Sequence, residues 1–260
     1  MITKDISTTE KLPENSQVVS KDRVRNLGEV YTAEKEVKAM LDLIGPEVSR
    51  LESRVFEPSC GNGNFIIEIL RRKLNQAFSS DTKWHKPLKN KKSEAERQIT
   101  IFKAVSSIYG VDICQQNVLD ARIRMYCFLI TGEDSLFDPV TDPSSRSKLA
   151  LLFGQAIQVE KDQENKIVEW ANNQSGDVSE SGDIFRRALY KLLQKNIIIG
   201  NTLTDTKLLF SEWSFPSGVS IQEKVFEFGE LSKPEKQQKP LSKVLHYGLK
   251  GLAHAQTNNQ

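Results

Sequence analysis

The stretch that decides the fold is Phe56-Glu57-Pro58-Ser59-Cys60-Gly61-Asn62-Gly63-Asn64-Phe65. Residues 54–57 predict a short buried strand, and residues 64–74 have the apolar spacing of a helix. Glycines between them permit positive φ angles and let a ligand lie against the main chain. A dinucleotide fingerprint would need a third glycine three residues after Gly63, and that position is Ile66. A nicotinamide oxidoreductase is therefore excluded. The alternative to a ligand-binding loop is an ordinary glycine-rich turn without a ligand.

Strands and helices alternate outward from this stretch. Residues 108–112 and 196–200 predict two more strands, and apolar residues at helical spacing lie between them. Such alternation is typical of an α/β fold with a parallel sheet and right-handed crossovers. Residues 207–210 are a candidate fourth strand, and residues 219–229 a candidate edge strand.

Composition limits the class of protein. The 260 residues are 38% hydrophobic and 27% charged, which is enough for a packed core. The three cysteines are too few for a disulfide framework, and their odd number points to a reducing cytoplasm. No apolar run approaches the roughly 20 residues that span a bilayer, and the N-terminus lacks the apolar core of a signal peptide. We therefore expect a cytoplasmic protein with no membrane partner.

Three parts are predicted along the chain. Residues 1–22 are polar and predict a mobile N-terminal tail, and residues 231–260 predict a polar C-terminal tail. Residues 23–230 form the predicted domain, with surface insertions at about 75–97 and 131–182.

The glycine-rich stretch resembles the cofactor loop of S-adenosylmethionine-dependent, adenine-specific DNA methyltransferases of the restriction-modification methylase subunit type. That family pattern is (Asp/Glu)-Pro-x-Cys-Gly-x-Gly-x-Phe. Every fixed position is present, as Glu57, Pro58, Cys60, Gly61, Gly63 and Phe65. The resemblance implies that the loop wraps the methionine half of S-adenosylmethionine and that Glu57 faces its ammonium group. It also implies a Rossmann-like methyltransferase sheet with helices on both faces, incomplete at the C-terminus of this chain.

An upstream segment extends the resemblance. Residues 28–33 match the family segment Gly-x-x-(Tyr/Phe)-Thr-Pro through Tyr31 and Thr32, with Ala33 in place of the proline. As the predicted N-cap of the following helix, Thr32 could present its hydroxyl and neighbouring N–H groups to the methionine carboxylate. The alternative is a plain capped helix.

Two downstream strand ends also match. In the family, the acid at the position of Asp112 accepts hydrogen bonds from both ribose hydroxyls, and Ile113 would pack on the adenine ring. The alternative is that Asp112 caps the following helix. Asn201 and Leu203 stand in the segment that usually ends Gly-Asp-x-Leu, so the Asn201 amide oxygen would accept from the adenine amino group.

The family's catalytic motif is missing. These enzymes hold the target amine with (Asn/Asp/Ser)-Pro-Pro-(Tyr/Phe/Trp), and this chain contains no Pro-Pro pair. At the expected place stand Ser211, Glu212 and Trp213, which are the catalytic candidates, although Trp213 could equally be a core residue. The predicted function is an S-adenosylmethionine-binding DNA adenine methyltransferase, or the cofactor-binding part of one, in a restriction-modification or phage context. The alternative is a non-catalytic methyltransferase-like partner protein.

DNA and a second subunit are the predicted partners. The subunit would supply catalytic or target-recognition parts. The first insertion carries Trp84 and lysines that could contact phosphates, although a solvated loop is the alternative. These lysines are Lys83, Lys86, Lys89, Lys91 and Lys92. The three histidines have no partner at metal-ligand spacing, so no metal site is predicted.

Overall fold

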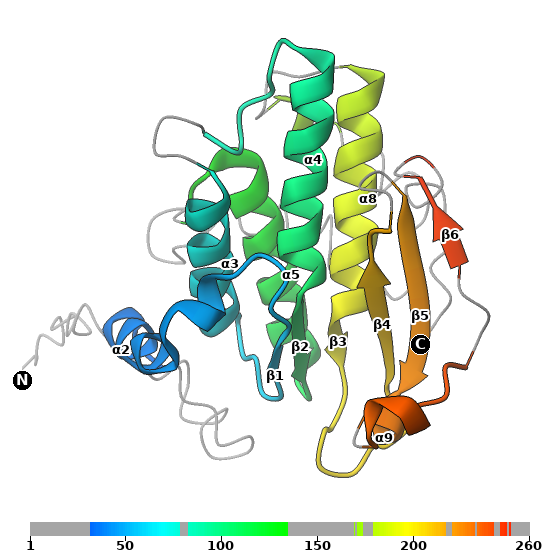
Figure 1. The fold of residues 1–260 in the computed structure, drawn as a ribbon. Helices are drawn as coiled ribbons and strands as arrows, with labels where there is room; N and C mark the ends of the chain where they lie inside the picture. Colours follow the sequence, from blue (N-terminus) through cyan, green and yellow to red (C-terminus); the bar gives the residue numbers. More distant parts are fainter. Residues whose placement is uncertain are drawn as a thin grey trace, which may run out of the picture.

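The computed structural model describes residues 32–78, 83–134, 169, 171–173, 179–216, 220–231, 233–241, 245–248 and 250. The predicted N-terminal tail and most of the predicted insertion 131–182 lie outside these residues, as does Tyr31. The described helices are α2 (Glu34–Ile44), α3 (Asn64–Ala77), α4 (Lys91–Ser106), α5 (Gln115–Thr131), α8 (Glu180–Asn196) and α9 (Phe228–Leu231), with short 3-10 turns at Gly45–Ser49 and Glu235–Gln237. The strands are β1 (Val55–Glu57), β2 (Ile108–Asp112), β3 (Ile197–Ile199), β4 (Leu209–Ser214), β5 (Ile221–Glu227) and β6 (Leu245–Tyr247) (Figure 1).

A three-stranded parallel sheet in the order β1-β2-β3 carries the glycine-rich stretch. Val55 pairs with Ile108, and Gly110 pairs with Ile197, so the three strands end at one common edge. The predicted strands at 54–57, 108–112 and 196–200 are confirmed, as is the α/β class. Every residue of β2 is buried, which explains why its sequence is almost continuously apolar.

The two faces of this sheet have different neighbours. Neighbouring residues of a strand point to opposite faces. On one face, a Cβ at Gly110 would lie 2.6 Å from the Ile66 side chain of α3. On the other, the Tyr109 hydroxyl donates to the Ser211 carbonyl of β4 at 2.9 Å. The expectation of helices on both faces is thus incomplete, because a second sheet packs against part of the Tyr109 face.

The second sheet is antiparallel, in the order β4-β5-β6. The predicted strand at 219–229 is confirmed as β5, but its predicted edge position is wrong, because β5 lies between β4 and β6. The candidate fourth strand also begins later than expected, at Leu209 instead of residue 207. It runs opposite to β1, since Phe210 contacts Phe56 while Glu212 bonds Arg54 (Figure 1).

The predicted insertion at 75–97 is helical at both of its ends. Helix α3 continues to Ala77, and α4 begins at Lys91. The Asn90 side chain caps α4 by accepting from the N–H groups of Lys92 and Ser93, at 3.0 and 3.1 Å. The first turns of α4 are so polar that their helical period is hidden in the sequence.

No helix among the described residues combines the length and apolar character needed to cross a membrane.

Candidate functional site

The loop between β1 and α3 depends on two glycines in the left-handed region. Gly61 has φ +52° and Gly63 has φ +93°. The Cys60 N–H donates to the Val111 carbonyl at 2.9 Å, which fixes the loop to β2. Gly63 is the N-cap of α3 and has no side chain to satisfy the first N–H groups of the helix. The start of α3 therefore has no side-chain cap from Gly63 at the carboxyl edge of the sheet.

The Asp112 carboxylate is held by protein donors. One oxygen accepts from the Gly61 N–H at 2.8 Å, and the other accepts from the Cys114 N–H at 2.8 Å and the Asn117 amide at 3.2 Å. The residue is 8% exposed. Asp112 thus joins the glycine-rich loop to the start of α5. This arrangement resembles the alternative in which Asp112 caps the following helix. A carboxylate offers about four acceptor directions, so one remains for a ligand hydroxyl.

Glu57 lies at the end of β1 with little compensation for its charge. Its carboxylate accepts from the Ser59 N–H at 3.3 Å. Burial raises the pKa of Glu57 above its ordinary value, and this hydrogen bond lowers the pKa by less. A desolvated carboxylate of this kind attracts a cationic group.

The Thr32 segment lies beside the loop, because the Asn64 amide donates to the Thr32 carbonyl at 2.9 Å. The N-cap of α2 is however Ala33, so the prediction that Thr32 caps this helix is wrong by one residue. The Thr32 hydroxyl is therefore not used as a cap of α2.

Asn201 closes its own turn at the end of β3. Its side-chain oxygen accepts from the Leu203 N–H at 3.0 Å, which weakens the expectation that this oxygen meets an adenine amino group. The neighbouring Thr202 hydroxyl donates to the Pro58 carbonyl at 3.3 Å, which joins this turn to the glycine-rich loop.

Three strand ends therefore meet as the sequence predicts. Glu57, Pro58, Gly61, Gly63, Asp112 and Asn201 lie in connected loops at one edge, with Thr32 beside them. Ile113 and Leu203 are 61% and 93% exposed there and offer apolar surface.

Cys60 and Phe65 differ from these two residues, because they pack against the hydrophobic core. Cys60 is buried, and burial raises the pKa of its thiol well above the ordinary value.

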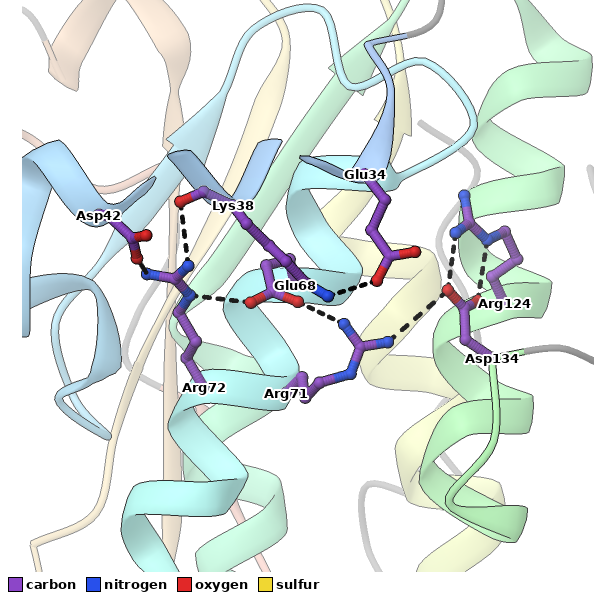
Figure 2. Close-up of polar contacts among 8 residues, drawn as sticks. All are labelled: Glu34, Lys38, Asp42, Glu68, Arg71, Arg72, Arg124 and Asp134. Atoms are coloured by element: carbon purple, nitrogen blue, oxygen red, sulfur yellow. Dashed lines mark hydrogen bonds and ion pairs between the residues drawn. The ribbon is translucent and has the colours of Figure 1, made fainter. Parts of the chain in front are cut away.

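A network of charged side chains supports the loop from outside (Figure 2). The Arg124 guanidinium donates to the Asn62 carbonyl at 2.9 Å and to the Asn64 side chain at 2.7 Å, and it pairs with Asp134. Asn64 in turn holds Thr32. Arg124 is not among the residues predicted from the sequence, which carries no signal for it, because its loop contacts lie some sixty residues away along the chain.

The same network joins α2 to α3. Glu68 is 8% exposed and pairs with both Arg71 and Arg72. Arg72 also pairs with Asp42 of α2 at 2.8 Å. The spacing of Glu68 to the two arginines is three and four residues, so this part could have been found from the sequence.

The catalytic candidates lie elsewhere. Ser211 and Trp213 are 1% and 5% exposed, and the Trp213 indole N–H donates to the Asn196 amide oxygen at 2.8 Å. Glu212 pairs with Arg54, just before the start of β1. Because β4 runs opposite to β1, these residues lead away from the glycine-rich loop. Trp213 takes the core position that was its alternative, since its ring lies beside Phe102.

Trp213→Phe is expected to lower the free energy of unfolding by about 1–2 kcal/mol, because the buried Asn196 oxygen loses its donor. Trp84→Phe is the matched control: the Trp84 indole N–H is buried and has no hydrogen-bond partner among the described residues. Urea unfolding of both variants measures the difference. An unchanged stability of Trp213→Phe would show that the Asn196 contact does not stabilise the core.

The five predicted DNA-contacting lysines, Lys83, Lys86, Lys89, Lys91 and Lys92, are exposed. Trp84 cannot accompany them in stacking on bases, because it packs on Phe128 with ring centroids 5.4 Å apart. Within the described part of the chain, no group of three or more His, Cys, Asp or Glu side chains could hold a metal ion. No family model, curated protein or solved structure matches this chain.

Proposed function

We propose that the chain binds S-adenosylmethionine at the carboxyl edge of its parallel sheet, as the cofactor-binding part of a DNA adenine methyltransferase. The observation that carries this proposal is the Gly61–Asp112 contact at 2.8 Å, which places the glycine-rich loop of β1 against the acid of β2. Ligands of open α/β sheets bind at such an edge. The Rossmann-like methyltransferase sheet is part of the same proposal.

The residues present fit the chemistry of the cofactor. Glu57 is half-buried with its charge little compensated, and it would face the methionine ammonium. The N–H groups at the start of α3, which have no side-chain cap at Gly63, would donate to the methionine carboxylate. Asp112 would take one ribose hydroxyl, and exposed Ile113 would cover the adenine ring. When bound, S-adenosylmethionine supplies an electrophilic methyl group on its sulfonium.

The methyl acceptor in this proposal is the amino group of adenine in DNA. The exposed lysines between α3 and α4 and in the first turn of α4 would help to bind the DNA. The described residues of β4 do not present a polar-Pro-Pro-aromatic unit at the site, because Ser211 and Trp213 are in the core. A second subunit would therefore hold the adenine. A restriction-modification or phage setting accords with a methyltransferase whose cofactor site and adenine site lie on two subunits.

The second candidate is a methyltransferase-like binding protein without chemistry. The observation that favours it is the same burial of Ser211 and Trp213. The two candidates agree on cofactor binding and differ on methyl transfer. Incubation with tritiated S-adenosylmethionine and DNA, with and without proteins that co-purify with the chain, separates them.

Glu57→Gln is expected to weaken S-adenosylmethionine binding about ten- to a hundredfold, because the ammonium loses its charged acceptor. Binding should also depend on pH in the parent protein. The pKa of Glu57 is raised in the free protein, and a bound ammonium favours the ionised form. Affinity should therefore fall as the pH drops through the raised pKa and stay constant at higher pH.

Isothermal titration calorimetry between pH 5 and 8 measures both effects. Glu52→Gln is the control, since Glu52 is an exposed carboxylate that pairs with Lys103. Its affinity and pH dependence should match the parent. Equal affinity of Glu57→Gln and Glu52→Gln would remove Glu57 from the site, and no binding by the parent would overturn the cofactor proposal.

A further inference from the structure

A second candidate site lies between the two sheets, apart from the glycine-rich loop. A cavity of about 660 Å³ is bounded by the start of β1, by β4 and by α9. Glu57, Gly61 and Asp112 are not among its lining residues. The volume is within the range of small-molecule sites.

Five of the thirteen residues that line the cavity are aromatic. Phe56, Phe210 and Phe228 contact one another with ring centroids 5.5 to 5.7 Å apart. Tyr109 and Phe226 are the other two aromatic residues of the lining. Phe56 remains 41% exposed, which is unusual for an aromatic ring inside a cluster of this kind. A flat apolar ligand would cover this surface and gain both burial and ring contacts.

The charged groups at the cavity favour a ligand with a negative charge. Arg54 lines it and bonds Glu212 through one of its terminal nitrogens at 2.7 Å. Lys224 also lies 3.8 Å from Glu212. Arg54 and Glu212 are the charged residues of the lining and balance each other, and Lys224 beside them adds one positive charge. The remaining guanidinium N–H groups of Arg54 can donate to an anion.

The main chain of Phe56, in the middle of β1, does not hydrogen-bond to β2. The Val55 N–H donates to the Ser107 carbonyl beside β2. In a parallel ladder alternate residues bond the same neighbour, so the N–H and C=O of Phe56 point to the outer edge of the sheet. Strand β1 is paired on one side in the described sheet.

We propose that this cavity binds a small planar aromatic molecule with one negative charge, with its rings on Phe56 and Phe228 and its anionic group at Arg54. The inference does not rest on the proposed cofactor site. Charge and shape are both required: an aromatic body alone would not use Arg54, and a small anion alone would not use the phenylalanine rings.

Two fluorescent probes of the same shape test the charge requirement. Anilinonaphthalene sulfonate carries one negative charge, and phenylnaphthylamine is its neutral counterpart. We expect the sulfonate to bind saturably at one site per chain. Arg54→Gln should weaken the sulfonate about tenfold and change the affinity of the neutral probe less than twofold. Arg50→Gln, at an exposed arginine paired with Glu47, is the control and should leave both affinities unchanged.

A filling variant tests the location. Leu231 lines the cavity and is 39% exposed, so Leu231→Trp should fold and should weaken both probes at least tenfold. Leu245→Trp is its control, at a leucine that is 41% exposed on β6 and is not a lining residue. Melting temperatures verify that each variant folds. Binding at several weak sites, equal loss in both arginine variants, or equal binding by both tryptophan variants would overturn the proposal.

Discussion

Asp112→Ala is expected to lower the free energy of unfolding by about 2–4 kcal/mol, measured by urea unfolding. The variant removes a carboxylate that is 8% exposed and accepts three hydrogen bonds. The Gly61 and Cys114 N–H groups lose their acceptor in a partly buried site. The same variant should bind S-adenosylmethionine less well, because the glycine-rich loop loses its contact with β2.

Asp42→Ala is the matched control, since it also removes one carboxylate. Asp42 has a side chain that is 70% exposed and pairs with Arg72. Loss of such a pair should change stability by no more than about 0.5 kcal/mol. If Asp112→Ala and Asp42→Ala were equally stable, the carboxylate of Asp112 would not hold the loop.

Gly63→Ala is the second variant with a large expected effect, a loss of about 2–4 kcal/mol of unfolding free energy. Gly63 has φ +93°, and a Cβ there would lie 3.1 Å from the Ala121 Cβ and 3.2 Å from its Cα. The substitution therefore combines backbone strain with a contact that the α5 main chain cannot easily relieve.

Two other glycines separate these causes. Gly45 has φ +74°, and a Cβ there would have nothing within 4 Å, so Gly45→Ala should cost only the backbone strain, about 1–2 kcal/mol. Gly248 has neither feature, and Gly248→Ala should change stability little. Thermal or urea unfolding should rank the losses Gly63, Gly45 and Gly248. A loss at Gly63 no greater than that at Gly45 would show that α5 moves aside.

The parallel sheet could be predicted because its signals are local. The apolar runs at 108–112 and 196–200 and the glycines after β1 each define a strand or a turn within ten residues. Since parallel strands end at one edge, the meeting of Glu57, Asp112 and Asn201 followed from the order of the strands.

The second sheet and the support of the loop could not be predicted in the same way. The residues of β4 predict a strand but not its direction, which the packing of Phe210 on Phe56 determines. The sequence could not decide between a catalytic and a core position for Trp213, because its acceptor, Asn196, comes from the end of α8. The role of Arg124 could likewise not be predicted, because its contact with the loop depends on how α5 packs beside the loop.

The antiparallel pairing of β4 with β5 has a consequence for the entropy of closing the chain. Paired residues of these strands, from Ser214 and Gln222 to Leu209 and Glu227, are 8 to 18 positions apart. Val55 and Ile108 are 53 positions apart, and Gly110 and Ile197 are 87 apart. Each doubling of a flexible loop costs only about 0.6 kcal/mol more, so the loops between the helices in the connections of the parallel sheet can change in length at small thermodynamic cost. The short β4–β5 connection has no such freedom, because its length determines which residues face each other.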